Sequence, residues 1–507
     1  MNLSLAMSTQ GVETECPPPP RIFARLFDAF ETAGLGWCCW KSARRLADAF
    51  AGRSDLDLLI DRCDRRPTVA ILTRCGFKHA PDAPGRDDPA MMSFLGFDEV
   101  SGALLHVHLH FRLILGPPLF KNSRLPCEQA FLSRSRLLSG CNLRVLAVED
   151  AALLLFVRVM LEFSPFDPVQ IRRRAQIEDK FRKDFLELTP HVDPARLRLA
   201  AAGIFDADIA DRIALAVTSG DPMAAPYDLR WKITRALSQY RLSGDVEAGL
   251  RRVVRTAKFL FGAFNRRILH LPRIWGRRAP GGGVVIAFVG VDGSGKSTAT
   301  TNILSWLGPE IDVLKVYFGT GDGAPSLVLA PFKALAKLVA RFIKTKPKGA
   351  SHGQISDRPP GPIYSLLFAV WAVAVALDKR HKLILIQRAA RRGFIVVTDR
   401  YPQDEIERFN DGPLLHRLAW TPDWLRRFEA SIYLRARRAP PDLVVKLHVG
   451  VDAVLRREPD MSPALIEDRL DCLKQLHFAG SKTVSIDATA PLETVTRTIK
   501  RAVWDIL

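Results

Sequence analysis

The sequence has few of the features that mark secreted, membrane-spanning or cysteine-rich metal proteins. Its eight cysteines form no Cys-x-x-Cys pair and no metal-ligand spacing, so no cysteine-based metal or redox site is predicted. The first thirty residues lack a charged start followed by an apolar core, and no secretory signal is expected. The longest apolar run, Leu366 to Leu377, is too short to span a bilayer and predicts a buried helix. A cytoplasmic location is therefore the expectation.

Positive charge is abundant and unevenly placed. The net charge is +19, and residues 230–278 hold thirteen basic residues against two acidic ones. Such a stretch attracts phosphate-rich partners, including nucleic acid and anionic membranes, although a solvated helix and linker would explain the same residues. No nucleic-acid-binding motif accompanies it, so no specific nucleic-acid partner is predicted. Peripheral membrane contact stays open, because residues 327–346 also combine evenly spaced basic residues with apolar ones: Lys333, Lys337 and Arg341.

Proline- and glycine-rich segments and changes in the hydrophobic pattern divide the chain into several predicted structural units. Residues 1–20 end in four prolines and are expected to form a disordered tail. Residues 21–145 alternate strand and helix patterns and predict an α/β domain, and residues 146–243 predict a helical region. A basic connector, 244–280, ends near a run of Pro and Gly that would form a flexible joint. Residues 281–507 form the last predicted domain.

The most informative segment, residues 284–298, reads VVIAFVGVDGSGKST. An apolar strand leads directly into the pattern Gly-x4-Gly-Lys-Ser, the phosphate-binding P-loop. Glycines let backbone amides curl around a polyphosphate, the lysine reaches its outer phosphates, and the serine hydroxyl can bind Mg²⁺. A simple strand-to-helix turn is the alternative, but the flanking strand and the Lys-Ser pair argue against it. The residues predicted to hold a nucleoside triphosphate are Gly290, Asp292, Gly293, Ser294, Gly295, Lys296, Ser297 and Thr298.

Five apolar segments of this domain predict strands, with helical patterns between them. This alternation predicts a parallel sheet with helices on both faces and a site at the carboxyl ends of the strands. The predicted strands are Val284 to Val289, Val313 to Phe318, Phe394 to Thr398, Leu443 to Val449 and Thr483 to Ile486.

Four motifs in this domain resemble those of thymidylate kinases. They are FVGVDGSGKST at 288–298, GFIVVTDRY at 393–401, PPDLVVKL at 440–447 followed by AVLRR at 453–457, and IDA at 486–488. The motifs occur in the family's order, and the resemblance covers about 281–507. It implies a P-loop kinase that uses ATP and Mg²⁺. A homodimer stays open.

The resemblance also implies roles for single residues. Lys296 would hold the donor phosphates, and Ser297 and Asp399 would organise Mg²⁺. Arg456 and Arg457 would close from a mobile lid and neutralise charge that develops on the γ-phosphate.

The acceptor side is less completely matched. Arg400 would grip the acceptor phosphate, because a planar guanidinium pairs well with phosphate oxygens. Arg380 is a second candidate for the acceptor phosphate, and a solvated helix arginine is the equal alternative. Asp292 would approach the acceptor sugar. Val289 stands where these kinases usually carry an acid, which leaves the acceptor open.

Further residues resemble a divergent bacterial branch of the family, often attached to a second domain and associated with surface-polysaccharide genes: YPQ at 401–403, NDGP at 410–413, Glu429-x3-Tyr433 and Arg457-x-Pro459. The expected activity is ATP-dependent phosphoryl transfer to a phosphorylated acceptor, most simply a nucleoside monophosphate such as dTMP. Two alternatives remain: a small-molecule or sugar kinase of surface-polysaccharide metabolism, and a nucleotide-gated binding protein at the membrane.

The amino-terminal domain resembles nucleotidyltransferases through WKS at 40–42 and SDLDLL at 54–59. Asp55 and Asp57 would point the same way from a strand and could share divalent metal ions with a nucleotide, while two solvated surface aspartates are the alternative. Lys41 replaces an expected glycine, and the strand expected to supply a third acid, 103–110, has none. We therefore expect the fold with altered or lost activity. Three histidines of that strand could bind metal or a phosphate, or form half-buried polar surface: His106, His108 and His110.

Overall fold

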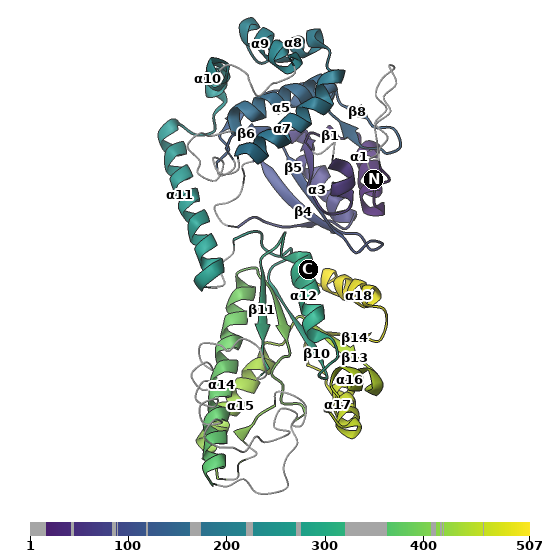
Figure 1. Cartoon of the computed structure of the whole chain (residues 1–507), viewed down its shortest axis with the longest axis vertical. Coiled ribbons are helices and arrows are strands. Elements are labelled where there is room, and N and C mark those ends of the chain that lie inside the picture. Colours follow the sequence, from purple (N-terminus) through teal and green to yellow (C-terminus); the bar gives the residue numbers. More distant parts are fainter. Residues whose placement is uncertain are drawn as a thin grey trace. The chain divides into compact units, whose positions relative to one another are not determined.

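The structure is a computed structural model of the chain. It describes residues 17–41, 45–83, 88, 90–117, 120–162, 174–219, 227–269, 275–319, 362–406, 412–415, 418, 420–459 and 461–507. The chain forms two compact units, Met1–Leu271 and Pro272–Leu507, and each is described by itself (Figure 1). Most of the predicted tail, Ser42, the basic 327–346 segment and residues 410–411 lie outside the described residues.

A seven-stranded mixed sheet lies at the centre of the first unit, in the order β3-β4-β5-β2-β1-β9-β8. The α/β character predicted for this region is confirmed. The long neighbours β2 and β5 run parallel, with Asp57 opposite His108, whereas β4 pairs antiparallel to β5. The strand bounds are β1 Trp37–Cys39, β2 Leu56–Ile60, β3 Lys78–His79, β4 Met91–Phe97, β5 Leu104–His110, β8 Arg136–Leu137 and β9 Arg144–Val145.

The two faces of this sheet bury different cores, as the two-residue period of strands requires. Leu56, Leu58 and Ile60 of β2 join one core with Phe23 and Phe27 of α1. Leu59, which points the other way, joins the second core. Helices α1 (Arg21–Thr32) and α3 (Arg65–Arg74) contact each other beside the first face. Asp57 and the histidines of β5 therefore belong to the second face.

The predicted helical region is confirmed, and it shares the second core with the sheet. Its first helix buries the apolar run Leu153 to Val157. Asp193 and Asp206 accept backbone hydrogen bonds at the starts of α8 and α9, which explains why those helices begin there. The helices are α5 Val148–Glu162, α7 Arg174–Leu188, α8 Pro194–Ala202, α9 Ala207–Thr218 and α10 Tyr227–Ala236.

The amino-terminal part of the basic connector is a helix, α11 (Asp245–Phe264), followed by a π-helical turn. Apolar side chains on α11 are largely exposed, among them Val246, Leu250 and Val253. Among the described residues, no helix is both long and apolar enough to cross a membrane.

The second unit contains the predicted all-parallel sheet, with five strands in the order β11-β12-β10-β13-β14. All five predicted segments form strands. The central strand β10 pairs with β12 and β13, both in parallel register. The bounds are β10 Val284–Gly290, β11 Val313–Tyr317, β12 Ile395–Asp399, β13 Leu443–His448 and β14 Lys482–Asp487.

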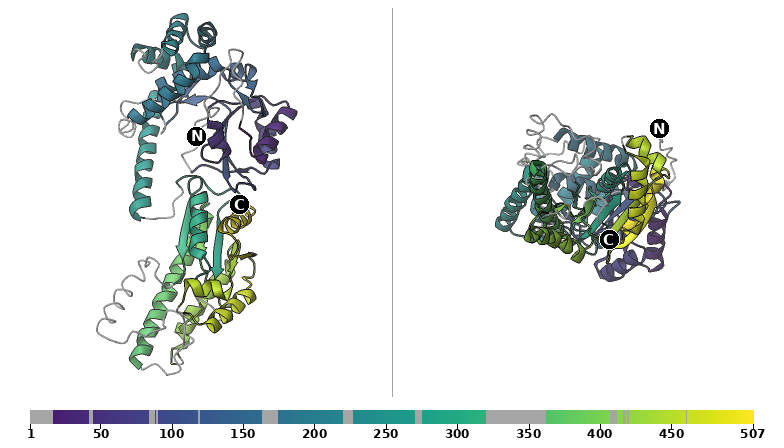
Figure 2. Two further views of the ribbon diagram at one scale, coloured as in Figure 1. Left: turned by 45° about the vertical axis from the view of Figure 1, so that its right-hand side comes forward. Right: turned by 90° about the horizontal axis from the view of Figure 1, so that it is seen from below.

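Helices cover both faces of this sheet, which confirms the predicted α/β architecture (Figure 2). Alternate residues of β10 join one core with α14 and α15: Val285, Ala287 and Val289. Helix α12 contacts the same strands, and α18 packs beside it. The predicted buried helix at 366–377 belongs to α14, but Leu366 and Val370 remain exposed. The helices are α12 Lys296–Leu307, α14 Pro362–Arg391, α15 Asp423–Arg438, α16 Val451–Arg457, α17 Pro463–Gln475 and α18 Leu492–Trp504.

Candidate functional site

The loop between β10 and α12 has a backbone that glycine makes accessible. Gly293 and Gly295 have φ angles of 77° and 91°, in the left-handed region that side chains rarely occupy. A Cβ atom at Gly290 would lie 2.5 Å from the Ser294 hydroxyl oxygen and 2.9 Å from a backbone oxygen of β13. The pattern Gly-x4-Gly-Lys-Ser therefore folds into a tight loop at the amino terminus of α12, where free amides and the helix dipole favour anions.

Lys296 and Ser297 begin α12, and Lys296 points back into this loop. The Lys296 ammonium is buried and donates to the carbonyl oxygens of Gly290 and Val291, at 3.1 and 2.8 Å. The Ser297 hydroxyl donates to Asp399 Oδ2 at 3.1 Å. Asp399 ends β12, the parallel neighbour of β10, so sheet register brings these residues together.

A carboxylate oxygen with unused bonding capacity lies beside this serine. Asp399 is 3% exposed, and its Oδ1 is buried with no hydrogen-bond partner recorded among the described residues. A buried carboxylate oxygen next to a serine hydroxyl is a donor set that fits Mg²⁺, which prefers oxygen ligands.

Asp292 gathers basic side chains at the same loop. Its Oδ1 accepts from Arg400 at 2.5 Å, and its Oδ2 accepts from Arg469 at 3.2 Å. Lys296 Nζ lies 3.8 Å from Oδ1. Arg400 has a φ of 69°, an uncommon conformation for a residue with a side chain, and such strain concentrates at functional sites. Arg400 and Lys296 thus lie at one site, joined by Asp292.

Arg469 is a site residue that the sequence analysis missed. It lies on α17, is 6% exposed and ion-pairs with Asp292. Burial lowers the pKa of Arg469, and the Asp292 charge opposes that shift. The signal for it was the position on α17, where buried residues recur as Ile466, Arg469 and Leu473.

The other predicted arginines have different positions. Arg457 Nη1 donates to the carbonyl oxygen of Gly293 at 2.6 Å, so this member of the pair contacts the P-loop. Arg456 is exposed on α16, and Arg380 is exposed on α14. Neither has a hydrogen bond or ion pair to the P-loop in the part of the chain that the structure describes.

Glu429 and Tyr433 of α15 support the loop at 412–415. The buried carboxylate of Glu429 accepts hydrogen bonds from the backbone amides of Leu414 and Leu415, at 2.7 and 2.8 Å. The Tyr433 hydroxyl donates to the carbonyl oxygen of Gly412 and accepts from Lys379, both at 2.8 Å. These contacts organise residues 412–415.

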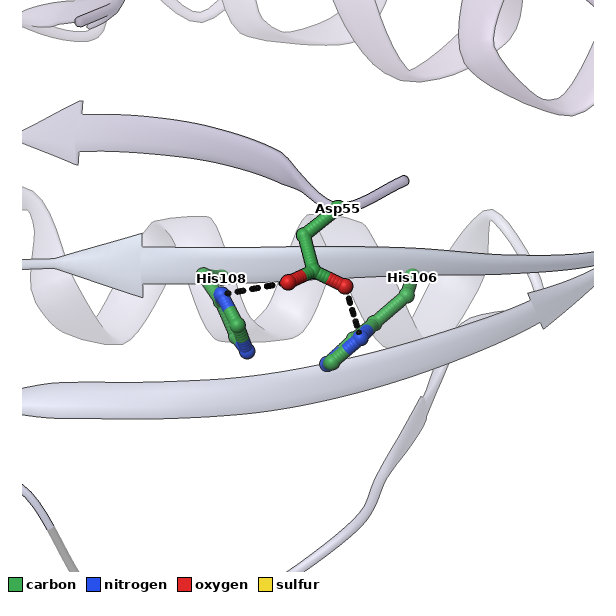
Figure 3. A group of neighbouring side chains, drawn as sticks. All are labelled: Asp55, His106 and His108. Carbon is green, nitrogen blue, oxygen red and sulfur yellow. Dashed lines mark ion pairs between the residues drawn. The ribbon is translucent and has the colours of Figure 1, made fainter. Parts of the chain in front are cut away.

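The first unit carries a second cluster, which we call the histidine–aspartate cluster: Asp55, Asp57, His106, His108 and His110. His106 Nδ1 lies 2.6 Å from Asp55 Oδ1, and His108 Nδ1 lies 3.6 Å from Asp55 Oδ2 (Figure 3). Asp57 Oδ1 lies 3.3 Å from His108 Nδ1 and 3.2 Å from His110 Nε2. The structure thus brings both predicted acids together with all three histidines.

Burial and hydrogen bonding determine the charges in this cluster. Burial lowers the pKa of His108 and lowers that of His110 to about 4, so both imidazoles are neutral at pH 7. Burial alone would raise the pKa of Asp57, but hydrogen bonds from His108 and His110 and the charge of Lys41 hold it well below its usual value. The pKa shifts of Asp57, His108 and His110 thus favour an ionised carboxylate beside two neutral imidazoles.

Comparisons with known proteins link the chain to two bacterial proteins named as ATP-binding. No protein-family model matches the chain. It is 29% identical over 224 residues to "Uncharacterized ATP-binding protein YghS" of Escherichia coli (strain K12), a match that covers 43% of this chain and 92% of that protein. It is likewise 29% identical over 232 residues to "Uncharacterized ATP-binding protein YghR" of the same strain, which covers 43% of this chain and 86% of that protein.

Proposed function

We propose that the second unit binds ATP and transfers its γ-phosphoryl group to a phosphorylated acceptor, most simply a nucleoside monophosphate such as dTMP. The observation that carries this proposal is the contact of Asp292 with Lys296, Arg400 and Arg469 at one P-loop. A site that only held a nucleotide would need the lysine and the loop amides. Two additional guanidinium groups, that of Arg469 buried and that of Arg400 half-buried, favour a second phosphate-bearing ligand.

The donor half of the site uses the P-loop. Its amides and Lys296 would hold the β- and γ-phosphates, with the lysine exchanging its present carbonyl partners for phosphate oxygens. Ser297 and Asp399 would hold Mg²⁺, which when bound would neutralise charge on the phosphates. The names of the two similar proteins support ATP as the nucleotide.

The acceptor half uses the arginines next to Asp292. Arg400 and Arg469 would bind the acceptor phosphate and place one of its oxygens in line with the γ-phosphorus. A new P–O bond then forms to that oxygen while the bond from the γ-phosphorus to the bridging oxygen breaks, and ADP leaves with the electron pair. Arg457, already against the P-loop at Gly293, would stabilise the charge on the transferring group.

An acceptor screen tests the proposal. The full-length chain is incubated with ATP and Mg²⁺, with and without dTMP, other nucleoside monophosphates or sugar phosphates, and ADP release and phosphorylated product are measured. We expect acceptor-dependent ADP release that Ser297→Ala reduces strongly. Ser305→Ala, at an exposed serine of the same helix, is the matched control. Product formed only from a non-nucleotide acceptor would contradict the choice of a nucleoside monophosphate and favour the sugar kinase.

One observation favours a second candidate, a nucleotide-gated protein at the membrane surface. Helix α11 exposes Val246, Leu250 and Val253 on the same helix as Arg251 and Arg252, a combination that suits anionic membranes. Acceptor-independent ATP hydrolysis, together with liposome binding that is lost when Arg251 and Arg252 are changed to Glu, would support this candidate over the kinase.

A further inference from the structure

The histidine–aspartate cluster has the spacing of a metal site. Asp57, His108 and His110 each offer one ligand atom, and these three atoms all lie within 4.8 Å of one another. Asp57 Oδ1 is 3.3 Å from His108 Nδ1 and 3.2 Å from His110 Nε2. Bonds of about 2.0–2.1 Å to a tetrahedral Zn²⁺ would place neighbouring ligand atoms about 3.3 Å apart. The observed contacts with the aspartate therefore need little rearrangement to accept an ion.

The fold holds this donor set in place. The parallel register of β2 and β5 puts Asp57 opposite His108, and the two-residue period of a strand puts His110 on the same face. Asp57 is 3% exposed and His110 is 8% exposed. Three ligands from two adjacent paired strands form a rigid set, unlike ligands on exposed loops.

The chemistry of the donors selects the class of ion. Mg²⁺ prefers six oxygen ligands, whereas imidazole nitrogen suits Zn²⁺, Co²⁺ and related transition metals. We propose that Asp57, His108 and His110 bind one divalent transition-metal ion of the Zn²⁺ type, with a further coordination position left open. The site belongs to the first unit and the P-loop to the second, and the proposal does not depend on the proposed phosphoryl transfer.

Neighbouring groups support these three ligands. The Trp40 ring packs edge-on against His110, with centroids 4.9 Å apart, and limits rotation of the imidazole. Lys41 contacts Asp57 Oδ2 at 3.5 Å, so the other carboxylate oxygen stays directed at the histidines. The 2.6 Å contact between Asp55 and His106 is too short for two ligands of one ion. We assign these two residues to positioning, because Asp55 also reaches His108.

Metal titration tests the site. The full-length chain, without a histidine tag and stripped with a chelator, is titrated calorimetrically with Zn²⁺ and with Mg²⁺ in the absence of nucleotide. We expect one Zn²⁺ per chain with at least micromolar affinity, and no comparable binding of Mg²⁺. His108→Ala and Asp57→Asn should each weaken Zn²⁺ binding more than about 100-fold, because removing a ligand exceeds the 10–100-fold effect of an outer partner. Asp55→Asn, at an outer partner, should weaken Zn²⁺ binding by about 10–100-fold.

Two controls separate a specific site from general effects. His79→Ala removes an imidazole from β3 of the same sheet but outside the cluster, and Lys296→Ala alters the P-loop; both should bind Zn²⁺ like the original chain. Failure of the original chain to bind Zn²⁺, or equal binding by His108→Ala and Asp57→Asn, would overturn the proposal.

A variant that does not fold would also lose Zn²⁺ binding, so a further measurement uses the original chain. Co²⁺ bound to the original chain should show the absorption of an ion with imidazole ligands in a low-coordinate site. If the original chain gives no Co²⁺ spectrum other than that of the hydrated ion, the proposed site is refuted as well. Circular dichroism of each variant identifies those that remain folded.

Discussion

Replacing Asp292 with Asn removes a negative charge that contacts three cationic side chains. The carboxylate lies 2.5 Å from Arg400, 3.2 Å from Arg469 and 3.8 Å from Lys296. The exposed fraction of the side chain is 22% for Asp292, 18% for Arg400, 8% for Arg469 and 7% for Lys296. Water therefore screens these charges poorly. The local charge rises by one unit, and an amide cannot accept charged hydrogen bonds through two oxygens.

The size of the effect follows from those contacts. A hydrogen bond between charged groups contributes about 1.5–3 kcal/mol, and the Asn oxygen can keep one weaker bond. Removing one partner of a fully buried ion pair lowers the free energy of unfolding by about 3–5 kcal/mol, but Asp292 and Arg400 are partly exposed. We therefore expect a loss of about 2–3 kcal/mol in the free energy of unfolding. For a unit of this size that corresponds to a melting temperature lower by about 4–12 °C.

Thermal unfolding of the full-length chain, with and without pyrophosphate, measures this effect. Phosphate oxygens can replace the lost carboxylate between the arginines, so pyrophosphate should raise the melting temperature of Asp292→Asn more than that of the original chain. Asp505→Asn, at an exposed aspartate of the same unit, is the control and should change stability by less than about 0.5 kcal/mol. The assignment of the three cations to phosphate binding is wrong if the melting temperature of Asp292→Asn equals that of Asp505→Asn. It is also wrong if pyrophosphate raises the melting temperatures of Asp292→Asn and of the original chain equally.

Four further predictions follow from the geometry. Lys296→Ala should abolish nucleotide-dependent turnover, measured as ADP release, while circular dichroism stays unchanged. Arg457→Ala should lower kcat by about 10²–10³, and Arg456→Ala should lower it less, since Arg457 alone of the two has a recorded contact with the P-loop among the described residues. Arg380→Ala should leave the KM for the acceptor within about twofold, because this side chain is exposed on α14; a large increase in KM would restore it as an acceptor ligand. Paired hydrogen bonds from Arg144, at 2.7 and 2.9 Å, lower the pKa of Glu31. The stabilisation of the folded state by this pair is therefore present above the unfolded pKa of about 4.3 and is lost as the pH falls through the folded pKa. Glu31→Gln should reduce the dependence of the free energy of unfolding on pH in that range, measured by acid unfolding.

The predicted strands of the second unit were confirmed, and the signal is clearest for β10 and β12, which are short, apolar and bounded by helical patterns; the edge strands β11 and β14 also contain polar residues. Parallel strands buried on both faces read as continuous apolar runs, and β10 and β12 fit that description. The mixed order of the first sheet could not be predicted, because β3, β8 and β9 have only two residues each. Such short strands form through pairing with neighbours, and local propensity gives almost no signal for them.

The histidine–aspartate cluster was partly predictable from local sequence. Alternation on one strand put His106, His108 and His110 on one face, and a spacing of two put Asp55 and Asp57 together. The pairing of those strands, and its register, depends on contacts between residues about fifty positions apart. A shift of the register by one residue would turn the face of β5 that meets Asp57, so only the structure shows that acids and histidines meet.

Arg469 shows what kind of sequence signal identifies a distant site residue. Ile466, Arg469 and Leu473 recur at helical spacing and are all buried, so a charge interrupts an apolar stripe of α17. Arginine is rarely buried without a partner, and the interruption therefore predicts an anionic partner on another element, here Asp292. Lys379 on α14 is likewise a buried cation with a partner on another element, the hydroxyl of Tyr433, which also holds the loop at 412–415. A charge in a buried stripe thus predicts a partner, and the identity of that partner distinguishes a ligand site from a structural contact.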